Sequence, residues 1–162
     1  MLDNRDLEIL TIMQKDARVS NAELARRLGM APSGILERVR KLEARGVIQS
    51  YEMRIDPAAV DRDLLAFVFV RAEESPGEMV TGDRLAEIPE VLEVHHVAGE
   101  DCYLVKVRVA GTGSLGDLLR HRFGAIPSVR STRSTIVLDS VKETMALPLR
   151  PPKETEELEK AS

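Results

Sequence analysis

Positively charged side chains gather in the stretch RLGMAPSGILERVRKLEARG, residues 27–46 of this 162-residue chain. Arg38, Arg40 and Lys41 lie within four positions of one another, behind a turn that reads Gly-Met-Ala-Pro. Cations at this spacing can neutralise phosphates while the helix that carries them enters the major groove of DNA. An ordinary solvated helix face can carry the same charges. The elements predicted around the stretch are therefore needed to distinguish a DNA-binding helix from a solvated one.

The stretch predicts a helix that begins at Pro32, because the fixed φ and missing N–H of proline suit the first helical position. Ile35, Val39 and Leu42 recur at i, i+4 and i+7 and form its inward stripe. Small residues in the leading turn let the backbone approach the bases, and the cations that follow can contact phosphates. The residues expected to contact DNA are Ser33, Gly34, Glu37, Arg38, Arg40 and Lys41.

Glu37 is an acid on this basic face, and two interpretations of it remain open. Its carboxylate can accept a hydrogen bond from the amino group of cytosine. It can also pair with Lys41, four positions on along the same side of the helix.

Two shorter helices are predicted before the basic one. Asp3 is a suitable N-cap for the first, which is expected to run to about Asp16. Ser20 followed by Glu23 predicts a capping box at the start of the second, and Gly29 suits its end. Three helices with a glycine in the turn predict a helix-turn-helix.

Charge and composition narrow the class of protein. The formal net charge is −4, but residues 1–55 carry +2 and the remainder −6, which suggests different partners for the two parts. A single cysteine, Cys102, excludes an internal disulfide framework, and nothing near it resembles a metal-ligand cluster. No stretch approaches membrane-spanning length. We expect a cytoplasmic protein with no cofactor, no metal, no membrane contact and no catalytic residue.

The second half predicts the element order β-α-β-β-α-β, which is typical of a ferredoxin-like fold. A strand-like stretch through Ile55 and a turn-rich segment precede it. Cys102 falls in a predicted strand and is expected to pack as a small buried hydrophobe. The predicted strands are 64–72, 91–99, 101–110 and 129–138, the helices are 77–88 and 114–126, and a tight glycine turn joins the two middle strands. The predicted domains are 1–55, linker 56–63, 64–149 and a flexible tail 150–162.

Four segments together, LDNRDLEIL, DARVSNAELARRLGMAPSGILERVRKLEARGVIQSY, VAGEDCYLVKV and VRSTRSTIVLDSVKET, resemble the Lrp/AsnC ("feast/famine") transcriptional regulators over about residues 2–149. The resemblance implies an α+β protein with an N-terminal winged helix-turn-helix and a C-terminal βαββαβ ferredoxin-like (RAM/AsnC-type) effector domain. It also implies sequence-specific binding of double-stranded DNA, modulated by a small molecule such as an amino acid. A homodimer paired through the sheet, assembling to a tetramer or octamer, is implied as well.

The resemblance places the effector near the turn between the two middle strands, which reads Gly99, Glu100, Asp101 and Cys102. A glycine turn can present backbone N–H groups to a carboxylate, and an acid can pair with an α-ammonium group. Relatives commonly carry an acid at the position of Cys102, so this chain leaves open which of its two acids faces the ligand; a plain hairpin connection is the alternative. Hydroxyl contacts are expected from Ser131, Thr132 and Ser134 on the last strand.

Two other functions fit the same architecture. An architectural DNA-binding protein would share the helix-turn-helix and bind no effector. An enzyme similar to the siroheme decarboxylases would need a general acid, for which the adjacent His95 and His96 are candidates. The exposed basic helix favours a regulator that is not an enzyme, because an enzyme has no need of that surface.

Overall fold

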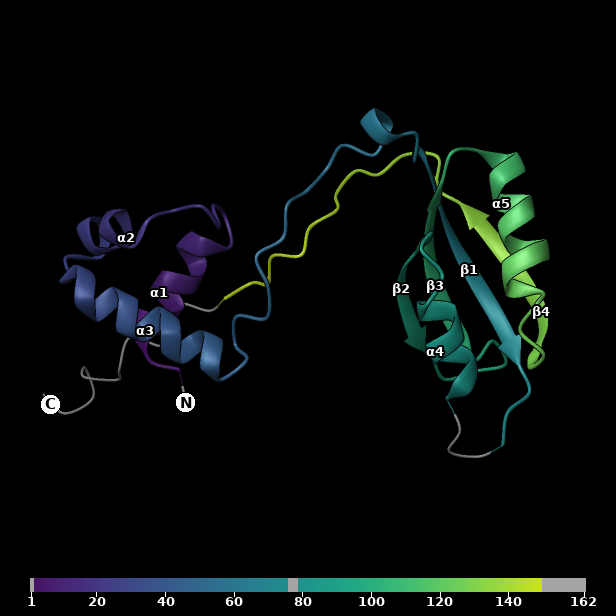
Figure 1. The fold of residues 1–162 in the computed structure, drawn as a ribbon, viewed down its shortest axis with the longest axis horizontal. Coiled ribbons are helices and arrows are strands. Elements are labelled where there is room, and N and C mark those ends of the chain that lie inside the picture. Colours follow the sequence, from purple (N-terminus) through teal and green to yellow (C-terminus); the bar gives the residue numbers. More distant parts are fainter. Residues whose placement is uncertain (1, 76–78, 150–162) are drawn as a thin grey trace, which may run out of the picture. The chain divides into compact units, whose positions relative to one another are not determined.

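The computed structural model describes residues 2–75 and 79–149, which divide into two compact units (Figure 1). The first unit comprises the chain up to Arg54 together with the segment that begins at Glu143, and the second comprises Ile55–Lys142. The sequence predicts a second domain over 64–149. Residues 143–149 of that range belong instead to the first unit. Within the described residues, no helix has the length and apolar character needed to cross a membrane.

The first unit is built on three helices, α1 (Asn4–Met13), α2 (Asn21–Leu28) and α3 (Pro32–Ala44). Each helix turns one apolar stripe toward a shared core, as the 3.6-residue period predicts. The stripe predicted for the basic helix is confirmed, since its three members are buried. The buried core residues are Ile9, Leu10, Leu24, Ala25, Ile35, Val39 and Leu42.

Side chains satisfy the free N–H groups at the first two helix starts. Asp3 and Asp6 exchange side-chain-to-backbone hydrogen bonds of 2.9 and 3.2 Å, which form a capping box on α1. Ser20 accepts from the N–H of Glu23 at 3.2 Å on α2. The reciprocal bond predicted for Glu23 is absent, because its carboxylate pairs instead with Arg26 and Arg27. The sequence-based capping box on α2 is therefore only half formed.

Residues 47–55, predicted to be strand-like, form neither helix nor strand. The segment that returns from the second unit lies against the first unit. The N–H of Leu147 donates to the side-chain oxygen of Gln14 at 2.7 Å, and the Gln14 amide nitrogen donates back to the Leu147 carbonyl at 3.2 Å. Leu149 packs against the helical core, and Arg54 donates to the Glu143 carbonyl at 2.7 Å.

The second unit is a four-stranded antiparallel sheet with the order β2-β3-β1-β4. Its strands are β1 (Leu64–Ala72), β2 (Val91–His96), β3 (Tyr103–Val109) and β4 (Val129–Ile136). A short 3-10 turn, η1 (Ala58–Val60), precedes β1. This is the strand order that a split βαβ pair produces, so the ferredoxin-like prediction is confirmed. The turn between β2 and β3 is longer than the tight one we predicted, since it spans residues 97–102 and takes Cys102 out of the strand.

Two helices, α4 (Val80–Ala86) and α5 (Thr112–Leu118), pack on one face of the sheet (Figure 1). A π-helical turn, η2 (Leu119–Phe123), continues α5. The start at residue 77 that we predicted for α4 lies outside the described residues, as does the tail 150–162. Alternate residues of β1 and β3 point into the core that the helices cover. Its buried members include Val68, Val70, Tyr103, Val105, Val107, Leu85, Leu115 and Phe123.

Gly82 on α4 lies directly against the fully buried ring of Tyr103. A Cβ at position 82 would lie 2.9 Å from Cε1 of that ring, closer than side-chain carbons approach. The ring has little freedom to withdraw, because the Tyr103 hydroxyl donates to Glu74 at 2.7 Å. Burial, and then this bond to the Glu74 carboxylate, raise the pKa of Tyr103 to about 12.

We therefore expect Gly82→Ala to lower the free energy of unfolding of the second unit by about 1–3 kcal/mol, the usual cost of overpacking. Gly113→Ala in α5 is the matched control, because its Cβ meets nothing within 4 Å. Alanine is the better helix former, so the control should gain up to about 1 kcal/mol. Urea unfolding of both variants measures the contrast, and equal effects of the two substitutions would contradict it.

Candidate DNA interface and effector site

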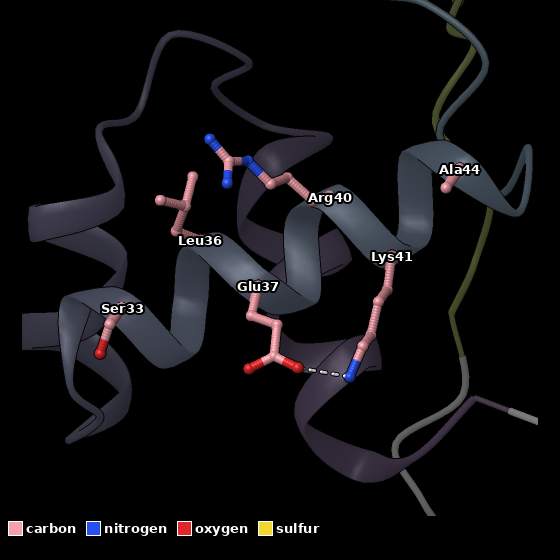
Figure 2. Close-up of a pocket in the computed structure, with 6 residues that line it drawn as sticks. All are labelled: Ser33, Leu36, Glu37, Arg40, Lys41 and Ala44. Carbon is pink, nitrogen blue, oxygen red and sulfur yellow. Dashed lines mark hydrogen bonds and ion pairs between the residues drawn. The ribbon is translucent and has the colours of Figure 1, made fainter.

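The outward face of α3 is a shallow, open hollow of about 290 Å³. Its residues recur at i, i+3, i+4, i+7, i+8 and i+11, opposite the buried stripe. Figure 2 shows Leu36 and Arg40 on one side of the helix and Glu37 and Lys41 on the other. The lining residues are Ser33, Leu36, Glu37, Arg40, Lys41 and Ala44.

Glu37 and Lys41 form an ion pair on this face, with Nζ and Oε1 2.6 Å apart (Figure 2). The hydrogen bond from Lys41 holds the pKa of the Glu37 carboxyl below its usual value. Both side chains remain about two-thirds exposed. Of the two interpretations left open by the sequence, the free chain adopts the pairing.

Arg38, which the sequence predicts to contact DNA, is engaged within its own unit in the free chain. Its Nη1 donates to Asp3 at 2.6 Å and to Asp6 at 2.8 Å, so the guanidinium links α3 to the N-terminus of α1. The Asp6 side chain is only 11% exposed, and that of Arg38 is 32% exposed. The two carboxylates raise the pKa of Arg38 still further, the Asp3 bond most of all. Arg38 is therefore a residue that positions α3.

Arg40 is the cation best placed for a partner. It is exposed, and in the part of the chain that the structure describes it forms no ion pair. Ser33 is exposed in the leading turn, and Gly34 is half-buried beside it. Leu36 is the member of this face that our sequence reasoning missed. The sequence does contain a sign of it, because Leu36 is an apolar residue at an outward position of the predicted helix.

The turn expected to hold the effector joins β2 to β3 and is closed by a 2.9 Å hydrogen bond from the Val97 N–H to the Cys102 carbonyl. Gly99 adopts φ +134°, a conformation that favours glycine. Asp101 pairs with Nη2 of Arg133 at 3.0 Å. Glu100 is exposed and, among the described residues, has no ion-pair partner. The two acids that the sequence left undecided are thus distinguished by their partners.

The three hydroxyl residues predicted on β4 are all exposed but do not share one face of the sheet. Thr132 pairs in register with Val70 and Ser134 with Val68, whose side chains point into the helix-covered core. Ser131 pairs with Arg71 and so points to the opposite, open face. This division follows from the two-residue period of a strand.

Arg133 is the residue that joins β4 to the turn, and the sequence reasoning passed over it. Its guanidinium lies 4.1 Å from the centre of the Phe69 ring while pairing with Asp101. Cys102 is half-buried, and its thiol donates to the Ala72 carbonyl at 3.3 Å. Cys102 therefore fits the packing role expected of it better than a role in contacting a ligand.

The histidines considered as general acids have ordinary surface contacts. Nε2 of His95 lies 3.2 Å from a carboxylate oxygen of Glu93, which also accepts from Lys106 at 2.9 Å. The His96 ring packs against Tyr103 with centroids 5.2 Å apart. Within the described residues, no three histidine, cysteine, aspartate or glutamate side chains are grouped as metal ligands.

Comparison with known proteins accounts for both units. The Lrp/AsnC ligand binding domain matches residues 65–147, and a winged helix-turn-helix DNA-binding domain matches residues 2–49. The leucine-responsive regulatory protein of Escherichia coli strain K12 is 36% identical over 151 residues, 92% of each chain.

Solved structures agree with these matches. A transcriptional regulator from Neisseria meningitidis, in complex with L-methionine, has a TM-score of 0.84 and 27% identity, covering 92% of this chain and 97% of that one. A feast or famine regulatory protein from M. tuberculosis, also complexed with L-methionine, has a TM-score of 0.84 and 39% identity, covering 91% and 99%.

A helix-turn-helix followed by a ferredoxin-like ligand-binding unit defines a class of DNA-binding transcription regulators. The chain belongs to the Lrp/AsnC family within that class.

The Arg38 contacts predict a loss of stability when they are removed. The Asp6 carboxylate is largely buried, and Arg38→Ala removes its cationic partner. The free energy of unfolding of the first unit should therefore fall by about 1–3 kcal/mol. Arg40→Ala, which removes an exposed arginine from the same helix, is the matched control and should change stability by less than about 0.5 kcal/mol. Urea unfolding followed by helical circular dichroism measures both, and equal stabilities would contradict the role given to Arg38.

The same contacts predict a pH dependence. The Asp6 N–H, and then Arg38, hold the pKa of Asp3 below its usual value of 3.8. A carboxyl whose pKa is lower in the folded state stabilises the fold above its unfolded pKa and loses that effect as pH falls through the folded value. The difference between wild type and Arg38→Ala should be constant from neutral pH down to about pH 5 and should narrow below about pH 4. A difference that stays constant at acid pH would contradict this assignment.

Proposed function

We propose that the chain is a sequence-specific transcription regulator that inserts α3 into the major groove of double-stranded DNA and is modulated by an amino acid. The observation that carries this proposal is the outward face of α3. It presents small residues in its leading turn and an exposed arginine that forms no ion pair among the described residues. Recognition helices of this type use their N-terminal residues to contact bases.

Arg40 is the proposed phosphate contact in this arrangement. Lys41 can join it, since its exposed ammonium group would exchange Glu37 for a phosphate on binding. Ser33 and Gly34 lie in the first turn, where small side chains permit close approach of the backbone. Arg38 contributes by holding α3 against α1.

The proposed effector is an α-amino acid bound at the turn between β2 and β3. The backbone around Gly99 would hold its carboxylate, and Glu100, whose carboxylate is exposed, would pair with its ammonium group. Asp101 instead orients Arg133. The two related structures solved with L-methionine support this ligand class. Ser131 lies on the same face of the sheet as Arg133, while Thr132 and Ser134 point the other way.

We further propose a homodimer, assembling to a tetramer or octamer, that pairs through the open face of the sheet. This face carries Phe67, Phe69 and Leu104 in a half-buried state, beside Lys106 and Arg133. Its apolar part is suited to packing against a second sheet. Pairing would couple helix-turn-helix units and raise their avidity for DNA.

We also propose that this regulator acts in the cytoplasm and is not an enzyme. The relatives are named as regulatory proteins. Of the histidines considered for catalysis, His95 hydrogen-bonds to Glu93 and the His96 ring packs against Tyr103. A purely architectural DNA-binding role would share α3 and differ in the absence of any response to a ligand.

DNA binding is tested first by Arg40→Ala. Loss of a phosphate contact should weaken binding several-fold for all sequences, and the slope of log affinity against log salt should fall by about 0.9 per contact. Arg84→Ala, an exposed arginine on α4 of the other unit, is the matched control and should leave the slope unchanged. Fluorescence anisotropy at several salt concentrations measures both, and an unchanged slope for Arg40→Ala would mean that another surface contacts the phosphates.

Effector binding is tested by calorimetric titration of the wild type with the twenty amino acids, with L-methionine as the first probe. Glu100→Gln should weaken binding of the responding amino acid at least tenfold, because the charged partner of the ammonium group is lost. Glu87→Gln, an exposed acid at the end of α4, is the control and should bind normally. An absence of heat with every amino acid would favour the architectural function.

A further inference from the structure

Leu36 is an apolar side chain in the middle of a charged helix face. It is the fifth residue of α3 and is 37% exposed. It belongs neither to the buried core of its unit nor to the partly buried residues that pack against that core. Its side chain is therefore only partly covered by its own unit, and the uncovered part is available to a partner.

Leu36 lies in an apolar part of the α3 surface that charged side chains flank. The hollow on α3 is mostly apolar, although four of its six lining residues are polar or charged. The Glu37–Lys41 pair lines the other flank of the same outward face, and Arg40 follows Leu36 one turn on (Figure 2). This side of the helix thus offers a methyl-rich contact next to a phosphate-binding cation.

A base edge in the major groove presents hydrogen-bond donors, acceptors and one apolar group, the 5-methyl of thymine. An apolar side chain cannot satisfy the donors or acceptors and would leave them without water. If α3 enters the groove as proposed, the base that best complements Leu36 is one that carries a methyl group. Its position in the N-terminal half of the helix is where recognition helices meet base edges.

We infer that Leu36 is a specificity-determining residue that contacts the 5-methyl group of a thymine in each half-site. The inference deepens the proposed function and rests on it, since it requires α3 in the major groove. Arg40 would anchor the adjacent phosphate, which fixes the register in which Leu36 meets the base. The methyl group and the leucine would bury each other from water.

The test compares thymine with uracil, which differs only in that methyl group. Duplexes bound by the full-length protein are selected from a random library, and each thymine of the selected site is then replaced singly by uracil. For the wild type we expect one position in each half-site where uracil weakens binding about fourfold, the effect of removing one buried methyl-sized group. Leu36→Ala should bind the thymine duplex more weakly and show no difference between thymine and uracil there.

Two controls separate this effect from a change in folding or assembly. Leu138→Ala removes a leucine that is 98% exposed in the other unit, and should keep the full thymine-to-uracil ratio even if its overall affinity changes. Leu36→Met restores an apolar side chain and should recover most of the ratio. Circular dichroism should show that Leu36→Ala has the helix content of the wild type.

Three outcomes would overturn the inference. The first is a wild type that binds every uracil duplex as tightly as the parent, and the second is a Leu36→Ala variant that retains the full ratio. The third is a Leu36→Ala variant with unchanged affinity, which would assign this surface to a protein partner. Failure to select any duplex at all would instead overturn the proposed function. The two failures are therefore distinguishable.

Discussion

The guanidinium of Arg38, shared between the carboxylates of Asp3 and Asp6, is the polar contact that ties α3, the proposed DNA-contacting helix, to the start of α1. Asp3 is at once the cap of α1 and a partner of α3, so the start of one helix and the orientation of another are fixed by the same few atoms. Ile35, Val39 and Leu42 set which face of α3 is buried, because they form a single apolar stripe. The ion pair adds a directional link between α3 and the N-terminus of α1.

The limits of α3 and its buried face could be predicted almost entirely from the sequence. Its limits follow from Pro32 and Gly46, and its buried stripe follows from the helical period. The role of Arg38 could not be predicted, because it depends on a contact with residues more than thirty positions away. Periodicity states which way a side chain points, but it does not state what that side chain meets.

The turn between β2 and β3, the proposed effector site, shows the same limit in a sheet. Composition and the family resemblance located the turn, yet they left Glu100 and Asp101 equivalent. Only the register of β4 against β1 brings Arg133 to Asp101 and separates the two acids. The same register divides the three β4 hydroxyls between opposite faces. The strand predicted for 47–55 failed for a related reason, since a β-prone stretch needs a partner in the sheet to become a strand.

The return of residues 143–149 to the helical unit has a consequence for how this protein can be recombined with its relatives. The N-terminal unit is assembled from two separate stretches of the chain, joined where Leu147 exchanges hydrogen bonds with Gln14 and where Leu149 reaches the core. A chimera made at one crossover near residue 55 would supply the second stretch from the wrong parent. Exchange of DNA specificity between family members therefore calls for two crossovers, one on each side of the sheet unit.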